Sequence, residues 1–148
     1  IMAKYDITTG AEVREWYFLR LAGRTIRLLF YDESVNKYCY RATNAALSAA
    51  WHFVVVVYDS TGGTGATTAN GMTFYVDGVV VASTATNDTA YVATEDTATI
   101  VTIGADKEAA AYGNFYVGDY GKLFVTKEAL SAATIWRMYI KTRGFVGL

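Results

Sequence analysis

The chain has 148 residues, with 13 lysines and arginines against 14 aspartates and glutamates, so its formal net charge is −1. Its apolar fraction of 53% is too high for a disordered chain, and its near-neutral charge argues against a nucleic-acid-binding protein. The length suits a single domain, 1–148, and the only cysteine, Cys39, excludes both an intrachain disulfide and a cysteine-based metal cluster.

The first half of the chain has the alternating pattern of β-strands. We expect strands at 14–21, 25–31 and 37–41. In the second of these, Ile26, Leu28 and Phe30 share the face that points inward. Residues 51–59 are valine-rich and apolar on both faces, which predicts a central strand of a two-layer sandwich.

The second half mixes loops, strands and one helix. Residues 60–71 and 105–113 are expected to be long loops, the first of them exposed and mobile. The pair Asp77-Gly78 between two apolar runs predicts a tight hairpin. Ser131 can cap a helix that runs to about Lys141 and ends at Gly144. Further strand residues are expected at 91–92, 100–103, 114–125 and 145–146.

These elements predict an all-β fold, an antiparallel two-sheet jelly-roll sandwich with one short C-terminal helix. The longest apolar runs, such as 53–58, are far shorter than the roughly 20 residues that span a bilayer, so we expect no membrane insertion.

Four ordered motifs resemble laminin-G-like jelly-roll domains of the concanavalin A-like lectin/glucanase superfamily. The segment WHFVVVVYD at 51–59 looks like the family's Trp-His-His-Val strand, and FYVDG at 74–78 matches its Tyr-Val-Asp-Gly strand. An Ile-Gly strand at 101–104 follows, and then residues 118–135, whose GDYGKL and ALSAATI fill the last two positions.

The resemblance also implies an expectation about the ends of the fold. Residues 1–4 (IMAK) look like an early strand of the family, before which relatives have one or two more strands. We therefore expect the chain to be part of a larger polypeptide, or the open sheet edge to be covered by another segment or chain.

By resemblance, the function is a non-catalytic recognition or adhesion module with carbohydrate as its ligand. The alternative is a structural assembly module on a virion or cell surface, whose partner is a neighbouring protein subunit. Either function implies an extracellular, cell-surface or virion location. No nucleic-acid partner is expected.

A glycoside hydrolase is the third alternative. Retaining glycosidases need two carboxyl groups about 5 Å apart, which residues i and i+2 of one strand provide. Asp106 and Glu108 have this spacing but fall in a predicted loop, so we assign no catalytic residue and predict that the chain is not an enzyme. The only histidine, His52, is interpreted as a hydrogen-bonded structural residue.

Sugar binding needs aromatic surfaces beside polar groups. The exposed aromatic candidates are Trp16, Tyr31, Tyr38, Tyr40, Tyr112 and Tyr116. The candidate ligand-binding residues are Tyr112, Asn114, Asp106, Tyr116 and Tyr40. Because relatives often hold calcium with loop carboxylates, a Ca²⁺ site at Asp106, Glu108 and Asp119 is a further possibility, against the simpler interpretation that these residues only shape turns.

Overall fold

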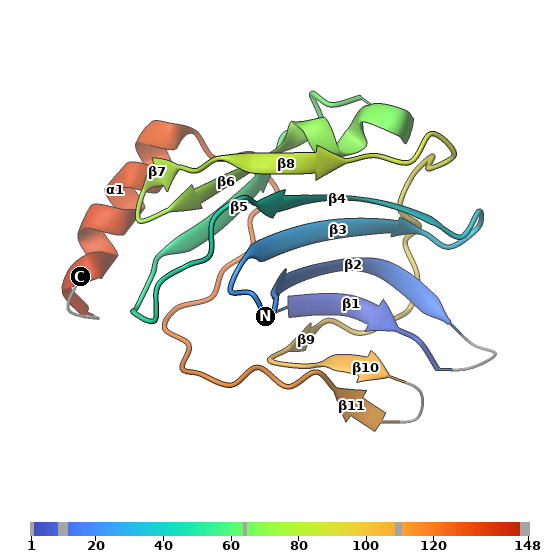
Figure 1. The fold of residues 1–148 in the computed structure, drawn as a ribbon, viewed down its shortest axis with the longest axis horizontal. Helices are drawn as coiled ribbons and strands as arrows, with labels where there is room; N and C mark the ends of the chain where they lie inside the picture. The colour runs from blue at the N-terminus through green and yellow to red at the C-terminus, as the bar shows by residue number, and fades with distance from the viewer. Residues whose placement is uncertain (1, 9–11, 64, 109–110, 146–148) are drawn as a thin grey trace.

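The computed structural model describes residues 2–8, 12–63, 65–108 and 111–145, with the backbone alone for Glu108 and Phe145. It confirms the predicted fold class: two β-sheets and a C-terminal helix (Figure 1). No helix in the described part of the chain is long and apolar enough to cross a membrane.

The large sheet has eight strands in the order β11-β10-β1-β2-β3-β4-β8, with β9 also paired to β1. The pairing of β1 with β10 is parallel, and the others are antiparallel. The bounds are β1 Met2–Asp6, β2 Val13–Arg20, β3 Ile26–Asp32, β4 Lys37–Thr43, β8 Ser83–Thr86, β9 Thr102–Ile103, β10 Asp106–Glu108 and β11 Ala111–Gly113.

The small sheet has three strands, β5 (Val54–Tyr58), β6 (Met72–Val76) and β7 (Val79–Val80). The prediction of a central strand at 51–59 was wrong, because within the described residues β5 pairs only with β6 and so lies at an edge. Its apolar character on both faces has another cause. Val54 and Val56 pack against the core, whereas Val55 is buried on the opposite side.

The predicted hairpin and helix are confirmed, and they contact each other. Asp77 and Gly78 both have positive φ, 52° and 80°, as a type I′ turn requires. Helix α1 (Ala132–Thr142) is capped by Ser131 as predicted. A Cβ on Gly78 would lie 2.7 Å from the ring of Trp136, so only glycine lets α1 approach this turn so closely.

Five other sequence predictions are corrected. The expected loop at 60–71 contains a 3-10 helix, η1 (Gly65–Gly71), which buries Thr68 and Ala69. The expected strand at 91–92 is instead an irregular segment with Tyr91 buried in the core. The expected loop at 105–113 holds the β10 and β11 strands, and the expected strand at 114–125 is irregular. Phe145 belongs to a 3-10 helix, η2 (Arg143–Phe145), and Val146 lies outside the described residues.

The core lies between the two sheets. Its buried side chains come from β3, β4, η1, β6 and the segment after β8: Ile26, Leu28, Cys39, Ala69, Met72, Phe74 and Tyr91. Burial raises the pKa of the Cys39 thiol to about 12, so this cysteine is an inert core residue, as predicted.

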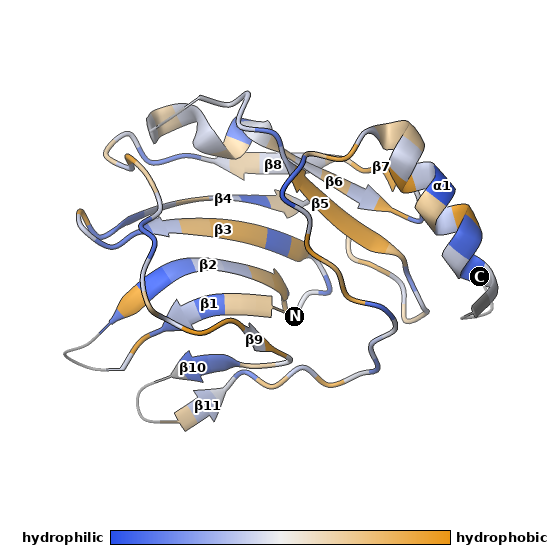
Figure 2. Cartoon of the chain, turned by 180° about the vertical axis from the view of Figure 1, so that it is seen from behind, coloured by the Kyte–Doolittle hydropathy of each residue, from blue (hydrophilic) through white to orange (hydrophobic). Residues whose placement is uncertain are grey.

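Residues 91–99, which we call the crossover segment, run from β8 toward β9 across the inner face of the large sheet (Figure 2). Three carboxylates hold it there. Asp32 accepts hydrogen bonds from the backbone N–H groups of 92–93, at 2.9 and 3.1 Å. Glu95 reaches back to the N–H groups of 33–34, at 2.8 and 2.9 Å, and Glu15 accepts from the N–H of residue 97 at 2.6 Å.

Candidate functional site

The outer face of the large sheet, which points away from the small sheet, carries a row of tyrosines. Strand register aligns Tyr17, Leu29 and Tyr40 across β2, β3 and β4, and places Tyr31 opposite Tyr38. Among the described residues, no element lies over this face, which is turned toward the viewer in Figure 1. The side chains of this face are therefore covered only by one another.

Five tyrosine rings form a continuous series of contacts across four strands. The ring centroids are 5.5 Å apart for Tyr5 and Tyr17, 6.3 Å for Tyr5 and Tyr31, 6.1 Å for Tyr31 and Tyr38, and 6.2 Å for Tyr38 and Tyr40. The last two pairs are stacked, with interplanar angles of 23° and 25°. We call these five residues, together with Arg14 and Arg27, the tyrosine face.

The two arginines of the tyrosine face each lie over one of its rings. The Cζ atom of Arg14 is 4.1 Å from the ring centroid of Tyr31, and that of Arg27 is 4.2 Å from the centroid of Tyr40. Both distances are well inside the range of cation–π attraction. The tyrosine face thus combines aromatic surface with positively charged hydrogen-bond donors.

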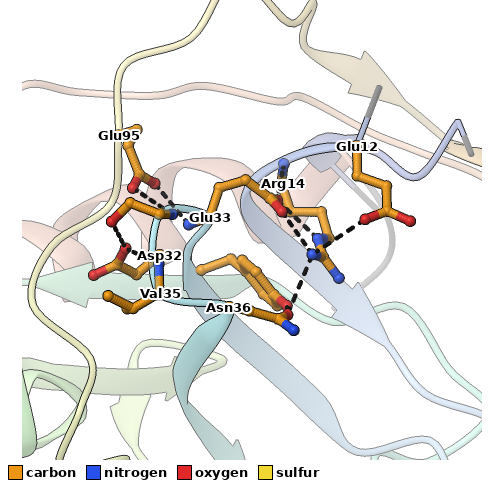
Figure 3. A network of polar contacts seen from close by, with 9 residues as sticks. Glu12, Arg14, Asp32, Glu33, Val35, Asn36 and Glu95 are labelled. Atoms are coloured by element: carbon orange, nitrogen blue, oxygen red, sulfur yellow. Dashed lines mark hydrogen bonds and ion pairs between the residues drawn. The ribbon is translucent and has the colours of Figure 1, made fainter. Parts of the chain in front are cut away.

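Carboxylates neutralise the charge of Arg14 (Figure 3). Its guanidinium makes two hydrogen bonds to Glu33, at 2.6 and 2.8 Å, and lies 3.6 Å from a carboxylate oxygen of Glu12. The hydrogen bond to Glu33 raises the pKa of Arg14, and the same contact lowers the pKa of Glu33. Arg14 therefore has a structural role in fixing the β3–β4 turn and the Tyr31 ring.

The phenol groups of Tyr5 and Tyr31 are neutral at physiological pH. Burial raises the pKa of Tyr5 to about 12 and raises the pKa of Tyr31 above its ordinary value. Tyr31 is only 5% exposed and hydrogen-bonds to Asn36. Tyr38 is 47% exposed and presents the most accessible ring of the row, so it offers the contact surface while Tyr31 supports it.

The residues predicted from sequence fall into two separate places. Tyr40 belongs to the tyrosine face, whereas Asp106, Tyr112 and Asn114 lie at the β10–β11 end, and three strands separate β10 from the β4 strand of Tyr40. There Asn114 Nδ2 donates to Asp106 Oδ2 at 3.2 Å. Tyr112 is 50% exposed and is the cross-strand partner of Lys107.

The β10–β11 end forms a small polar cluster of its own. Asp106 is 5% exposed, and its Oδ1 has no hydrogen-bond partner among the described residues. Tyr116 donates its backbone N–H to the carbonyl of Gly104 at 2.7 Å, and its ring lies 4.6 Å from that of Tyr120. The structure therefore brings together Asp106, Asn114 and the Tyr116 backbone near Gly104.

The calcium prediction at Asp106, Glu108 and Asp119 stays a prediction. Within the described residues, no three acidic, histidine or cysteine side chains form a group that could hold a metal. The side chain of Glu108 lies outside the described part of the structure. Asp106 and Glu108 both belong to β10, so the spacing required of a catalytic pair occurs on a strand rather than in a loop.

His52 joins the loop before β5 to the β6–β7 turn. Its Nδ1 lies 2.8 Å from Asp77 Oδ2, and its Nε2 lies 2.8 Å from Ser48 Oγ. The other oxygen of Asp77, Oδ1, accepts a hydrogen bond from the backbone N–H of Phe53 at 2.9 Å. These contacts confirm a hydrogen-bonded histidine, although the order of groups is also that of a serine-hydrolase triad.

Sequence reasoning found part of the tyrosine face: it named Tyr31, Tyr38 and Tyr40 as exposed aromatic candidates but did not connect them with Tyr5 and Tyr17. The alternation of 25–31 and 37–41 already placed Arg27 and Tyr31 opposite the core positions Ile26 and Leu28. What it could not supply was the register that lines up residues of four strands. The available signal was the repeated tyrosine at alternate positions, Tyr38 and Tyr40.

Comparison with known proteins identifies the class of fold. Residues 2–136 match the Laminin_G_3 family, described as the concanavalin A-like lectin/glucanases superfamily. The chain belongs to this family, in agreement with the two-sheet architecture. None of the curated proteins and none of the solved structures compared with it is significantly similar.

Proposed function

We propose that this chain is a non-catalytic recognition module that binds carbohydrate on the tyrosine face. The observation that supports it best is the unbroken series of five tyrosine rings across an uncovered sheet face. The C–H groups on one side of a sugar ring pack against the electron-rich faces of aromatic rings. A row of such rings suits a chain of sugars rather than a single residue.

The experiment compares two tyrosines of equal exposure in the two candidate places. Tyr38 is 47% exposed on the tyrosine face, and Tyr112 is 50% exposed near the polar cluster. In a glycan array followed by titration calorimetry, we expect Tyr38→Ala to weaken binding about tenfold or more and Tyr112→Ala to leave it unchanged. The reverse pattern would place the ligand at the β10–β11 end. A wild-type protein that binds no glycan would refute the proposal.

The proposal that the chain is not an enzyme is tested separately. Among the described residues, Ser48, His52 and Asp77 line neither of two cavities, one beside Trp16 and Tyr91 and the other beside Tyr5 and Ile100. We expect no hydrolysis of β-glucans or of activated esters above that of an Asp106→Ala, Ser48→Ala double variant. Turnover that disappears in the double variant would contradict this proposal and leave the binding proposal intact.

We also propose a second function, assembly with a neighbouring protein subunit. It is favoured by the apolar side chains of 115–125, where Phe115 is 68% and Val117 is 91% exposed. Such exposure in the irregular segment that follows β11 favours the packing of an apolar surface from another chain. This function would place the protein on a virion or a cell surface, whereas glycan binding also fits an extracellular location.

Light scattering on the purified chain distinguishes the two functions. Assembly predicts a defined oligomer that a Val117→Asp variant dissociates. A control substitution at an exposed polar residue, Asp96→Asn, should leave the oligomer unchanged. A monomer at high concentration that shows no association would count against the assembly function.

A further inference from the structure

We propose that Arg27 makes the tyrosine face selective for acidic glycans, by binding the carboxylate of a sugar that packs against the exposed ring of Tyr38, the neighbour of Tyr40. This inference rests on the proposed carbohydrate function and adds the chemical class of the sugar. It requires no change in the site and no covalent step.

The position of Arg27 fixes its guanidinium at one end of the tyrosine row. Arg27 pairs with Ala42 of β4 and with Leu19 of β2, so it projects on the same face as Tyr17 and Tyr40. Its Cζ lies 4.2 Å from the centroid of the Tyr40 ring. A sugar ring placed along the tyrosine row would lie beside this cation.

Arg27 also has unused hydrogen-bonding capacity. Its Nε is buried and has no hydrogen-bond partner among the described residues. Its two terminal Nη groups likewise make no hydrogen bond or ion pair with any described residue. Unlike the Nε, these Nη groups are not fully buried. The Nη groups are therefore the donors that a ligand can reach, because the Nε is closed off from solvent, and no described protein acceptor competes for them.

Arg14 provides an internal contrast on the same face. It stacks on Tyr31 in nearly the same geometry, but Glu33 and Glu12 occupy its guanidinium. The inner-face Arg41 is likewise engaged, with Ser83 at 2.8 Å. The tyrosine face therefore carries one neutralised arginine and one arginine without a carboxylate.

The chemistry of the guanidinium favours a carboxylate ligand. Its planar fork matches a carboxylate with two parallel hydrogen bonds, and its stacking on a ring holds the fork in a fixed plane. A carboxylated sugar offers that group at the edge of the same ring whose C–H face stacks on tyrosine. Sulfate esters and phosphates share part of this chemistry, and they are separated by the test.

The test uses two ligands that differ only at the carboxyl group: a galacturonic acid oligosaccharide, which is charged, and the neutral methyl ester of the same oligosaccharide. Titration calorimetry on the wild-type chain should show at least about tenfold tighter binding of the acid. Arg27→Gln should remove the difference, because only the acid uses the guanidinium. Arg27→Lys should retain part of it, because the charge remains but the fork is lost.

Arg24→Gln is the matched control. Arg24 is an exposed arginine in the β2–β3 turn, so its substitution changes the net charge equally without touching the tyrosine face. This variant should preserve the preference for the acid. If Arg24→Gln and Arg27→Gln lose the preference for the acid equally, net charge alone attracts the oligosaccharide, and the inference is overturned.

The remaining outcomes separate this inference from the proposed function. If acid and ester bind equally well and Arg27→Gln changes neither, Arg27 selectivity is refuted while carbohydrate binding stands. Stronger binding of a sulfated oligosaccharide or of single-stranded DNA than of the acid would also overturn it, in favour of general polyanion binding. If no glycan of any charge binds, the proposed function itself fails.

Discussion

The two faces of β3 use similar residues for different purposes. On the inner face, Ile26 and Leu28 are covered by the small sheet and belong to the core. On the outer face, Leu29 and Tyr31 are equally buried, but only by the side chains beside them. A residue on this sheet can therefore be buried without belonging to the core.

The origin of burial decides what a substitution on each face affects. Removing an inner side chain leaves a cavity between two sheets, which neighbouring residues cannot fill. Removing an outer side chain opens a surface to water. We therefore expect inner substitutions to lower stability and outer substitutions to lower binding, and three measurements test this division in decreasing order of effect.

The largest effect is expected at Phe74, a fully buried side chain of β6. Phe74→Ala should lower the free energy of unfolding by about 3–5 kcal/mol, because it removes a large core side chain. Chemical denaturation monitored by tyrosine and tryptophan fluorescence measures it. If Phe74→Ala lowers the free energy of unfolding by less than about 1 kcal/mol, the core does not lie between the two sheets.

The intermediate effect is a pH dependence at Asp32, which holds the crossover segment. Burial would raise the pKa of Asp32, but hydrogen bonds from Ser34 and from the backbone of 92–93 outweigh it and lower the pKa to about 2. The ordinary value is 3.8, so the charged carboxylate contributes about 2 kcal/mol of stability. Because the pKa is lowered on folding, this contribution is present above the ordinary value and is lost as the pH falls toward 2.

Unfolding of Asp32→Asn at a series of pH values tests this contribution. The variant should be less stable than the wild type near neutral pH, and the gap should narrow as the solution is acidified. Asp96→Asn is the control: it removes only the ion pair between a fully exposed carboxylate and Lys4, at 3.1 Å, a surface contact that contributes little to stability, so it should follow the wild type throughout. A constant gap between Asp32→Asn and the wild type would exclude titration of Asp32 as its origin.

The smallest effect on stability is expected at Tyr38. Tyr38→Ala removes an exposed ring from the tyrosine face, so it should lower the free energy of unfolding by less than about 1 kcal/mol. The same substitution is the one expected to weaken glycan binding most. Thermal denaturation and calorimetry on one preparation measure both, and a stability loss as large as that of Phe74→Ala would remove the distinction between the faces.

Sequence reasoning succeeded where the signal is local. The Asp77-Gly78 turn needs positive φ at both residues, and Ser131 offers a capping oxygen, so both could be predicted from a few adjacent residues. It failed where partners are distant. Residues 114–125 have the composition of a strand but lack a paired strand in the described structure, and β5 has the composition of a central strand but lies at an edge.

The candidate site shows the same limit. Asp106 and Asn114 were predicted together and do form a hydrogen bond, because they lie close in sequence. Tyr40 was predicted with them but lies on β4, four strands away from β10. Asp106 and Asn114 were grouped because they are close in sequence, whereas Tyr40 was added only because it is aromatic.

The sequence by itself determined the class of fold, the core face of β3, the hairpin turn, the helix and the motifs of the superfamily. These depend on the alternation of side chains, on turn geometry and on residue type, all of which are written locally. Only the tertiary structure decided that Tyr5, Tyr17, Tyr31, Tyr38 and Tyr40 form one surface, and that Glu33 neutralises Arg14 while no described carboxylate neutralises Arg27. Register between strands is fixed by long-range pairing, so no single stretch of sequence contains it.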